Sequence, residues 1–318
     1  MSKIISLTQA PINPDVAEGP KSVNAYWIDT IDKIRLRVAH WFLKERSKGT
    51  VFLFQGRTEN IEKYGRISEE LLTNGFETFA IDFRGQGLSH RFTNDRMLGH
   101  VSDFSDYQLD VLAMLEAAET LNLPRPWFLL CHSLGACIGL RAIQETLPVT
   151  ACTFSAPLWG INLSPLQRLA AWPLCWTAVL TGRHHSYVPS TSGKSYVLTN
   201  PFEGNRLTND PDMFRYFQSI STNLPDHQTG GPSLGWFYAA LKETRRLSRS
   251  RPPNLPCLTF CGSNDTIVDL GSVQKVMKTW KNGKLRQIEN AKHDVFHEKP
   301  ETRNAIFAEI VSFFEANT

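Results

Sequence analysis

The segment of residues 127–142 places a serine at a turn between two apolar runs, and it constrains the fold more than any other part of the chain. Residues 127–130 are apolar, as in a buried strand, and residues 135–142 are mostly small or apolar, as in a buried helix. Ser133 lies between them. The usual pattern at such a turn is Gly-x-Ser-x-Gly, and here Cys131 takes the first place and Gly135 the second. A turn this tight lifts the hydroxyl clear of the sheet, so we predict a nucleophilic Ser133; a serine that caps a core helix is the alternative.

Two later strand ends supply an acid and a base for this serine. A serine hydroxyl needs a general base, and the base needs an acid that orients it. The apolar strand 255–261 runs into a turn that carries Asp265, and the alternating strand 284–288 leads into a loop that carries His293. The order serine, aspartate, histidine at strand ends is typical of hydrolases with such a serine turn. We therefore predict that Ser133, Asp265 and His293 are the catalytic residues.

Several neighbouring residues compete for these roles. Asp269 follows Asp265 by four residues, but it starts a helical stretch and resembles an N-cap. Asp294 and His297 follow His293 closely, and His132 should point away from the serine because the turn is tight. The pair at 184–185 is two histidines without a carboxylate or cysteine at metal spacing. We therefore expect neither a metal nor any other cofactor.

The loop after the apolar strand 51–54 predicts the oxyanion hole. Gln55 and Gly56 follow this strand directly, and Gly56 would let the backbone approach a substrate. In hydrolases of this type one donor is the amide after the nucleophile, here Leu134, and the other comes from such a loop. We expect the second donor to be the backbone N–H of Arg57; an ordinary turn is the alternative.

The rest of the chain alternates between predicted strands and helices. Apolar strands that alternate with amphipathic helices favour a mostly parallel sheet covered on both faces. We predict an α/β fold with eight strands, in which the predicted site lies at the carboxyl ends of the parallel strands. The strands are expected near 23–29, 34–42, 51–54, 77–82, 126–131, 150–155, 256–261 and 284–288, and the helices near 60–74, 104–122, 134–146, 270–281 and 301–316.

One long stretch breaks this alternation. Residues 158–253 contain no convincing strand, and residues 162–180 are unusually apolar and rich in tryptophan. A structureless loop of that length is improbable, so we predict an inserted helical cap between two parts of the core, residues 1–157 and 254–318. The apolar helix is either the cap's own core or a wall of an acyl-binding pocket that can touch lipid. The residues expected to line the pocket are Gly56, His132, Trp159, Trp172, Trp176 and Trp236.

Composition limits the partners and the compartment. The 318 residues carry a formal net charge of +3, which is too small to imply a nucleic-acid partner. Five of the six cysteines lie in or beside apolar runs, which favours buried free thiols and a reducing compartment. The first eight residues lack the apolar stretch of a signal peptide. We expect a cytoplasmic protein. The sequence does not decide whether the cap contacts a membrane surface, or what the oligomeric state is.

Several segments together resemble one enzyme family. Residues 55–64, 82–89 (Asp-Phe-Arg-Gly-Gln-Gly-Leu-Ser), 99–107 and 291–298 resemble loops of the lysophospholipase L2 and monoacylglycerol lipase group of α/β-hydrolases. Residues 205–210 and 230–236 resemble cap segments of the lysophospholipase branch, and the likeness extends from about residue 20 to the end.

This resemblance implies a serine hydrolase that cleaves carboxylic esters of lipids with one acyl chain, either lysophospholipids or monoacylglycerols. The alternative is a small-ester carboxylesterase or another enzyme of the same fold with a non-lipid substrate. Dehalogenases and epoxide hydrolases of this fold carry an aspartate at the turn, so Ser133 argues against both. A member that only binds would be expected to lack part of the triad.

Overall fold

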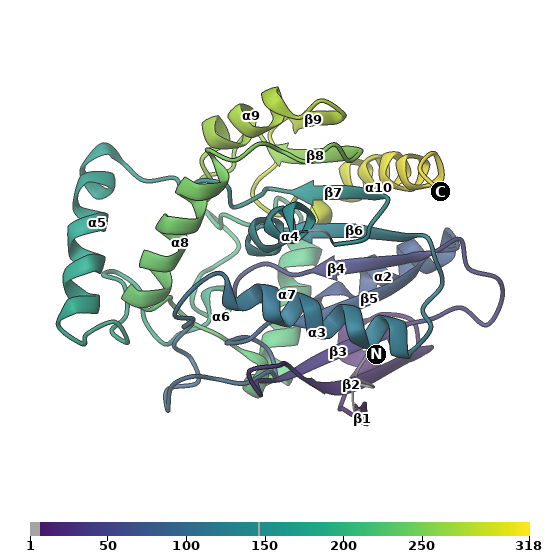
Figure 1. Cartoon of the computed structure of the whole chain (residues 1–318), viewed down its shortest axis with the longest axis horizontal. Helices are drawn as coiled ribbons and strands as arrows, with labels where there is room; N and C mark the ends of the chain where they lie inside the picture. Colours follow the sequence, from purple (N-terminus) through teal and green to yellow (C-terminus); the bar gives the residue numbers. More distant parts are fainter. Residues whose placement is uncertain (1–6, 146) are drawn as a thin grey trace.

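The computed structural model describes residues 7–145 and 147–318, and these form one nine-stranded sheet with helices on both faces (Figure 1). The strand order is β1-β2-β3-β5-β4-β6-β7-β8-β9. Strands β1, β2 and β3 pair antiparallel, as do β3 and β5, while β5, β4, β6, β7, β8 and β9 run parallel. All eight predicted strands are present. The prediction of eight was one too few, because β1 has only two residues and is too short to leave a pattern.

The elements have the following bounds. The strands are β1 (Thr8–Gln9), β2 (Val23–Asp29), β3 (Arg35–Trp41), β4 (Thr50–Phe54), β5 (Glu77–Asp82), β6 (Trp127–His132), β7 (Ala151–Ser155), β8 (Cys257–Gly262) and β9 (Gly283–Ile288). The α-helices are α1 (Pro14–Ala17), α2 (Gly65–Thr73), α3 (Asp106–Thr120), α4 (Leu134–Gln144), α5 (Pro165–Leu180), α6 (Tyr196–Thr199), α7 (Pro211–Asn223), α8 (Leu234–Leu247), α9 (Leu270–Thr279) and α10 (Pro300–Glu315). The 3₁₀ helices are η1 (Ile61–Tyr64), η2 (Pro225–His227) and η3 (Val295–His297).

The predicted helices are found with small shifts at their ends. Residues 60–74 hold two elements rather than one, because Asn60 caps the 3₁₀ helix η1, which then continues into α2. The helix predicted at 134–146 ends at Gln144, and residue 146 lies outside the described residues. Residues 1–6, on which the expectation about a signal peptide mainly rests, also lie outside them.

Buried side chains on both faces of the sheet explain the continuous apolar runs of its central strands. In β4, Phe52 and Phe54 join the core under α3 and α4, while Val51 and Leu53 join the core under α2 and α10. Strand β6 alternates in the same way. A parallel strand that is buried on both faces needs apolar residues at every position, and this is the pattern that the sequence shows.

Of the helices between β7 and β8, α5 and α8 extend the molecule beyond one end of the sheet (Figure 1). Helix α5 packs against α8 through a small cluster that includes Cys175, Ala178 and Leu234. Helix α7 is held against the core because the Tyr216 hydroxyl donates to the carbonyl of Ala17 at 2.6 Å. These helices occupy the segment in which the sequence predicts the cap.

Two further observations concern the whole described chain. All six cysteines are free and buried. Among the residues that the structure describes, none of the helices combines the length and apolarity needed to cross a bilayer.

Candidate active site

Ser133 occupies the strained turn between β6 and α4. Its backbone has φ 50° and ψ −111°, a conformation that a non-glycine residue rarely adopts, and its N–H donates to the Ser155 carbonyl at 2.9 Å. Gly135 makes the close crossing possible, because a Cβ there would lie 2.1 Å from the carbonyl oxygen of Phe54. The turn therefore has the geometry of a nucleophile elbow.

The structure brings the three predicted catalytic side chains into one hydrogen-bonded chain. The Oγ of Ser133 lies 3.0 Å from Nε2 of His293, and Nδ1 of His293 lies 2.8 Å from Oδ2 of Asp265. All three residues are buried. Both distances lie within hydrogen-bond reach, and they join a nucleophile to a base and the base to an acid.

Asp265 is held as a carboxylate by its surroundings. Burial raises the pKa of Asp265, but the hydrogen bond and charge of His293 and the amides of Ile267 and Val268 outweigh it, so that the net pKa is lowered. Its Oδ1 accepts from these two amides at 2.7 and 3.2 Å, while Oδ2 faces the histidine. The ionised acid therefore favours the imidazole tautomer that carries its proton on Nδ1 and leaves Nε2 free to accept.

The competing residues have other partners. Asp269 caps α9 by accepting from the Gly271 amide at 3.1 Å. His132 turns away from Ser133, and its Nδ1 lies 3.1 Å from Oγ of Ser155. The Nδ1 of His297 lies 2.9 Å from Oδ1 of Asp294.

The loop after β4 lies beside the nucleophile turn. Gly56 packs so tightly there that a Cβ would lie 2.9 Å from the His132 ring. Its own N–H donates to Glu59 at 2.6 Å. Within residues 7–145 and 147–318, the amides of Arg57 and Leu134 donate no hydrogen bond to the protein, as donors kept for a substrate oxygen should.

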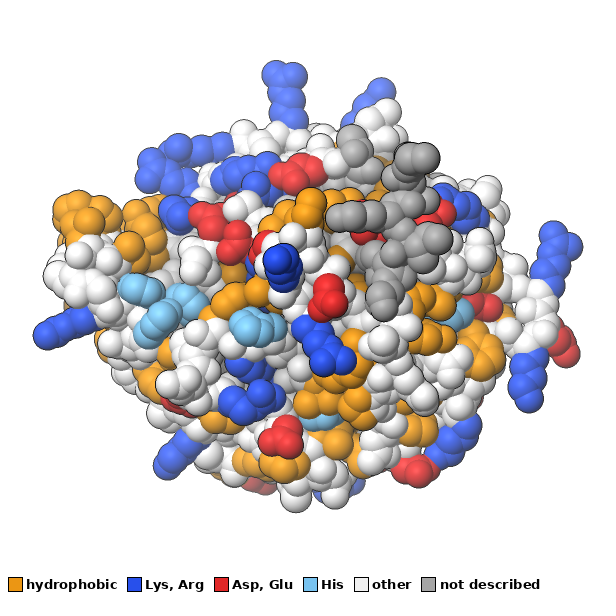
Figure 2. Space-filling model, turned by 60° about the horizontal axis from the view of Figure 1, so that its bottom comes forward, with side chains coloured by type: hydrophobic (Ala, Val, Ile, Leu, Met, Phe, Trp, Pro, Cys, Tyr) orange, Lys and Arg blue, Asp and Glu red, His pale blue; other side chains and the backbone are white. Residues whose placement is uncertain are grey.

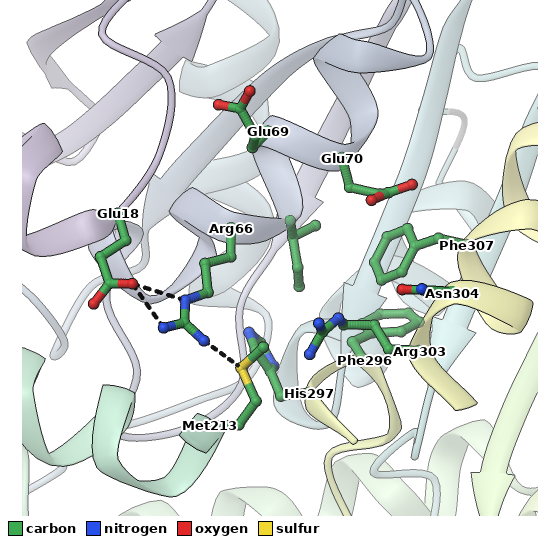
Figure 3. A pocket seen from close by; sticks show the side chains of 11 residues that line it. Glu18, Arg66, Glu69, Glu70, Met213, Phe296, His297, Arg303, Asn304 and Phe307 are labelled. Atoms are coloured by element: carbon green, nitrogen blue, oxygen red, sulfur yellow. Dashed lines mark hydrogen bonds and ion pairs between the residues drawn. The ribbon is translucent and has the colours of Figure 1, made fainter. Parts of the chain in front are cut away.

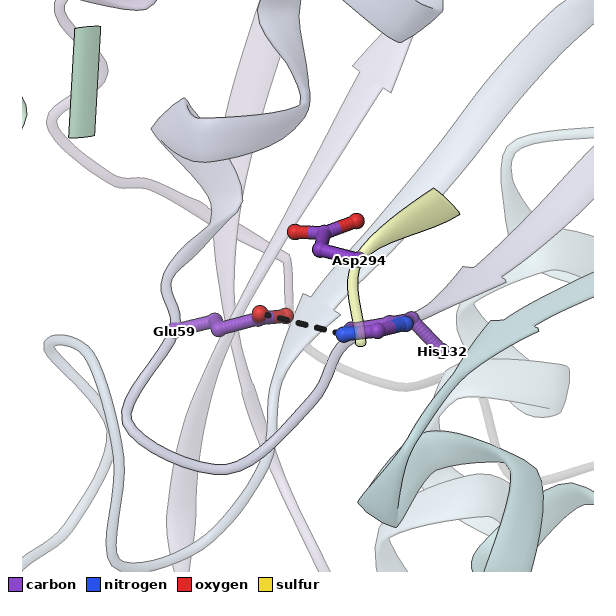
Figure 4. Close-up of side chains that lie close together, drawn as sticks. All are labelled: Glu59, His132 and Asp294. Atoms are coloured by element: carbon purple, nitrogen blue, oxygen red, sulfur yellow. Dashed lines mark ion pairs between the residues drawn. The ribbon is translucent and has the colours of Figure 1, made fainter. Parts of the chain in front are cut away.

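A buried charged cluster lies beneath the site and joins its loops (Figure 4). Lys63 Nζ contacts a carboxylate oxygen of Glu59 and lies 2.6 Å from Oδ2 of Asp294, while Nε2 of His132 lies 3.6 Å from Glu59. The cluster thus ties the loop after β4 to the loop of His293. Sequence reasoning gave it no role, and the only local signal was the i, i+4 spacing of Glu59 and Lys63.

This cluster also has donor atoms of the kind that bind a metal. One ligand atom from each of Glu59, His132 and Asp294 lies within 4.8 Å of the others. The ammonium of Lys63, however, already contacts both carboxylates. Burial lowers the pKa of Lys63, but the two carboxylates outweigh it and raise the net pKa, so a positive charge already balances them. The residues present do not favour a metal here.

The predicted pocket residues lie in different environments. Trp159 is fully buried and stacks on Trp280, and Trp236 is buried and donates from Nε1 to the Tyr107 hydroxyl at 3.2 Å. Trp172 is half-buried against Tyr238, and 53% of the surface of Trp176 is exposed. The four tryptophans thus differ in burial and in partners, and their part in a substrate pocket stays a prediction.

A cavity of about 300 Å³ opens elsewhere, between α2, α7 and α10 (Figure 3). Its walls carry charged pairs such as Arg66 with Glu18, and its floor contains His297 and Phe296. Neither Ser133 nor any of the four predicted tryptophans lines it. It is thus separate from the serine site, although His297 in its floor lies 2.9 Å from Asp294 and Phe296 packs near the His132 ring.

The sheet topology and the serine turn define the class of protein: the chain is an α/β-hydrolase of the serine-hydrolase type. A family model described as serine aminopeptidase, S33, matches residues 45–300, so the chain belongs to that family.

Three known proteins are similar over most of the chain. A probable lysophospholipase L2 of Haemophilus influenzae is 26% identical over 290 residues, which cover 90% of each chain. The monoglyceride lipase of Mus musculus is 26% identical over 98% of this chain and 95% of its own. The crystal structure of a soluble variant of monoglyceride lipase from Saccharomyces cerevisiae has a TM-score of 0.69 at 17% identity and covers 99% of this chain and 96% of its own, a likeness of fold.

Proposed function

We propose that the protein hydrolyses carboxylic esters of lipids with a single acyl chain, by an acyl-enzyme mechanism. His293 takes the proton of Ser133 as its Oγ attacks the ester carbonyl, and the charge of Asp265 stabilises the imidazolium that forms. The amides of Arg57 and Leu134 donate to the oxyanion. His293 then returns the proton to the leaving alcohol, and water repeats the sequence on the acyl-enzyme. The observation that carries this proposal is the pair of hydrogen bonds at 3.0 and 2.8 Å.

We further propose that residues 158–253 form a cap that contributes to acyl binding. Support comes from the apolar contact of α5 with α8, from Trp172 against Tyr238, and from the names of the relatives. A small-ester carboxylesterase remains the alternative, since the triad alone serves both.

The side chain of Arg57 favours a lysophospholipid over a monoacylglycerol. Its guanidinium donates to the Gly230 carbonyl at 2.8 Å and lies over the Trp236 ring, and among the described residues it forms no ion pair. Burial lowers the pKa of Arg57 to about 10, which still leaves it charged at neutral pH. A cation without a counter-ion, on the residue whose amide is the proposed oxyanion donor, suits a phosphate-bearing head group.

Two experiments test these assignments. A fluorophosphonate probe should label the wild type and fail to label Ser133→Ala, and labelling of both would refute the nucleophile assignment. Turnover should then be compared on matched lysophospholipids, monoacylglycerols and p-nitrophenyl esters. Arg57→Met keeps the backbone amide, so it should raise KM for the lysophospholipid and leave the monoacylglycerol nearly unchanged. Equal effects on both substrates would remove the phosphate assignment and leave the esterase intact.

We also propose that the outer face of α5 contacts a lipid surface. Its exposed apolar side chains are Leu166, Leu169, Leu174, Trp176, Val179 and Leu180. An exposed apolar face of this kind can lie in the interface of a bilayer. The wild type should sediment with lipid vesicles, and a variant with Leu166→Ser and Leu169→Ser should stay in the supernatant. The exposed Leu112→Ser on α3 is the matched control, and equal sedimentation of all three proteins would refute the contact.

A further inference from the structure

Three histidines from distant parts of the chain lie side by side, with His100 buried, His184 half-buried and His185 exposed. The ring centroids of His100 and His185 are 4.4 Å apart, those of His184 and His185 are 4.2 Å apart, and those of His100 and His184 are 5.9 Å apart. His100 follows β5, whereas the other two follow α5. Figure 2 shows histidine side chains, in pale blue, on one face of the molecule, some side by side and others apart.

The backbone around these histidines is fixed by hydrogen bonds between three segments. The Gly235 amide donates to the His184 carbonyl at 2.8 Å, and the Ser233 amide donates to the Gly99 carbonyl at 2.9 Å. Gly235 leaves the space that this approach needs, because a Cβ there would lie 3.0 Å from the His100 ring and 3.1 Å from the His184 carbonyl oxygen. The fold therefore brings the backbones of these three histidines close together, while the exposed His185 ring stays free to change its rotamer.

His100 has the second hydrogen bond that is typical of a metal-bound histidine. Its Nδ1 lies 2.7 Å from Oγ of Ser233, which fixes the ring and leaves Nε2 as the ligand atom. Oγ of Ser102 lies 3.5 Å from Nε2, too far for a strong hydrogen bond.

We propose that His100, His184 and His185 bind one divalent transition-metal ion such as Zn²⁺. Three imidazoles with water in the fourth position form a common zinc site, and imidazole suits zinc, copper and nickel. The donor atoms of the three are not all within 4.8 Å of one another, so at least one ring must rotate to complete the site, and the exposed His185 has the most room to do so. The ion would link the segment after α5 to the segment after β5, and so fasten the proposed cap to the core.

Calorimetric titration of the full chain with ZnCl₂, after treatment with a chelator, tests this site. The wild type should bind one Zn²⁺ and melt at a higher temperature with it. His185→Gln and the double variant His184→Gln/His185→Gln should bind at least about tenfold more weakly. His185 is exposed and His184 is half-buried, so the single variant His185→Gln carries little risk to folding, and thermal melting of the double variant checks that it folds. His90→Gln is the control, because this exposed histidine contacts Phe92 and lies outside the cluster.

Cobalt supplies an independent readout of the coordination. Co²⁺ bound to the wild type should give the visible absorption of a tetrahedral site, and the double variant should lack it. Equal Zn²⁺ affinity in the wild type and the double variant, or no saturable binding by the wild type, would overturn the proposal. Loss of binding in His90→Gln as well would also overturn it.

Discussion

The thiol of Cys131 occupies the space that Gly139 leaves by having no side chain. A Cβ on Gly139 of α4 would lie 2.6 Å from Sγ of Cys131 on β6. The first position of the serine turn can therefore hold a cysteine instead of a glycine, because the residue that faces it on α4 is itself a glycine and leaves room for the thiol. Burial also raises the pKa of the Cys131 thiol, which keeps it neutral.

We predict that Gly139→Ala destabilises the protein by about 1–3 kcal/mol, because the added methyl overpacks the turn. The change Cys131→Ala removes the sulfur that the methyl group added at residue 139 would overlap. The double variant should therefore recover most of that loss, and urea unfolding of the four proteins gives the coupling. Strictly additive losses would contradict the account of Cys131.

The acid of the triad can be separated from its nearest competitor. Asp265→Asn should lower kcat by about 100-fold or more, because the amide favours the wrong histidine tautomer. Asp269→Asn keeps the cap of α9 and should change kcat only slightly. Measuring kcat of both variants on one p-nitrophenyl ester decides between the two aspartates. A large loss in Asp269→Asn with little change in Asp265→Asn would exclude Asp265 as the acid.

The sequence predicts the helices and strands whose apolar residues recur with a regular period. It does not predict contacts between residues that are far apart in the chain and that only the fold brings together. Strands such as β4 are visible because both faces are buried. Contacts such as Lys63 with Asp294, 231 residues apart, or His100 with His185, leave no local pattern. The same limit applies to tryptophan: Trp159 and Trp176 look alike as apolar residues, but one is fully buried and the other exposed.

Acid should destabilise the protein through His132. Burial lowers the pKa of His132 from 6.5 to about 4, so the unfolded chain takes up a proton between these values and the folded chain does not. The free energy of unfolding should therefore fall as the pH falls from 6.5 to 4, by about 2 kcal/mol at pH 5. His132→Gln should reduce the difference in the free energy of unfolding between pH 7 and pH 5, even if the variant is less stable than the wild type at both values. Urea unfolding at the two pH values measures this difference. An unchanged difference would count against this origin.

Lys63 should matter far more than a lysine in a surface ion pair. Lys63→Met leaves the carboxylates of Glu59 and Asp294 buried without their cation, which should cost about 3–5 kcal/mol. The same change at Lys48, which pairs with Glu315 at the surface, should cost less than about 1 kcal/mol. Denaturant unfolding of the two variants compares their losses in the free energy of unfolding. Similar losses would mean that the buried cluster around Lys63 does not stabilise the loops of the site.

The length of the acyl chain is the sharpest test of the proposed lipid substrate. Each methylene that enters an apolar pocket contributes roughly 0.8 kcal/mol, which is about fourfold in kcat/KM if it acts in the transition state. Efficiency should therefore rise from two-carbon esters towards twelve-carbon esters and level off when the pocket is full. A second acyl chain should be poorly accepted, because the proposed cap would have to open for it. All esters should be assayed below their micelle thresholds, so that interfacial effects do not imitate the trend. A flat or falling profile would favour the small-ester carboxylesterase instead, since the triad would be unaffected and only the apolar binding would be missing.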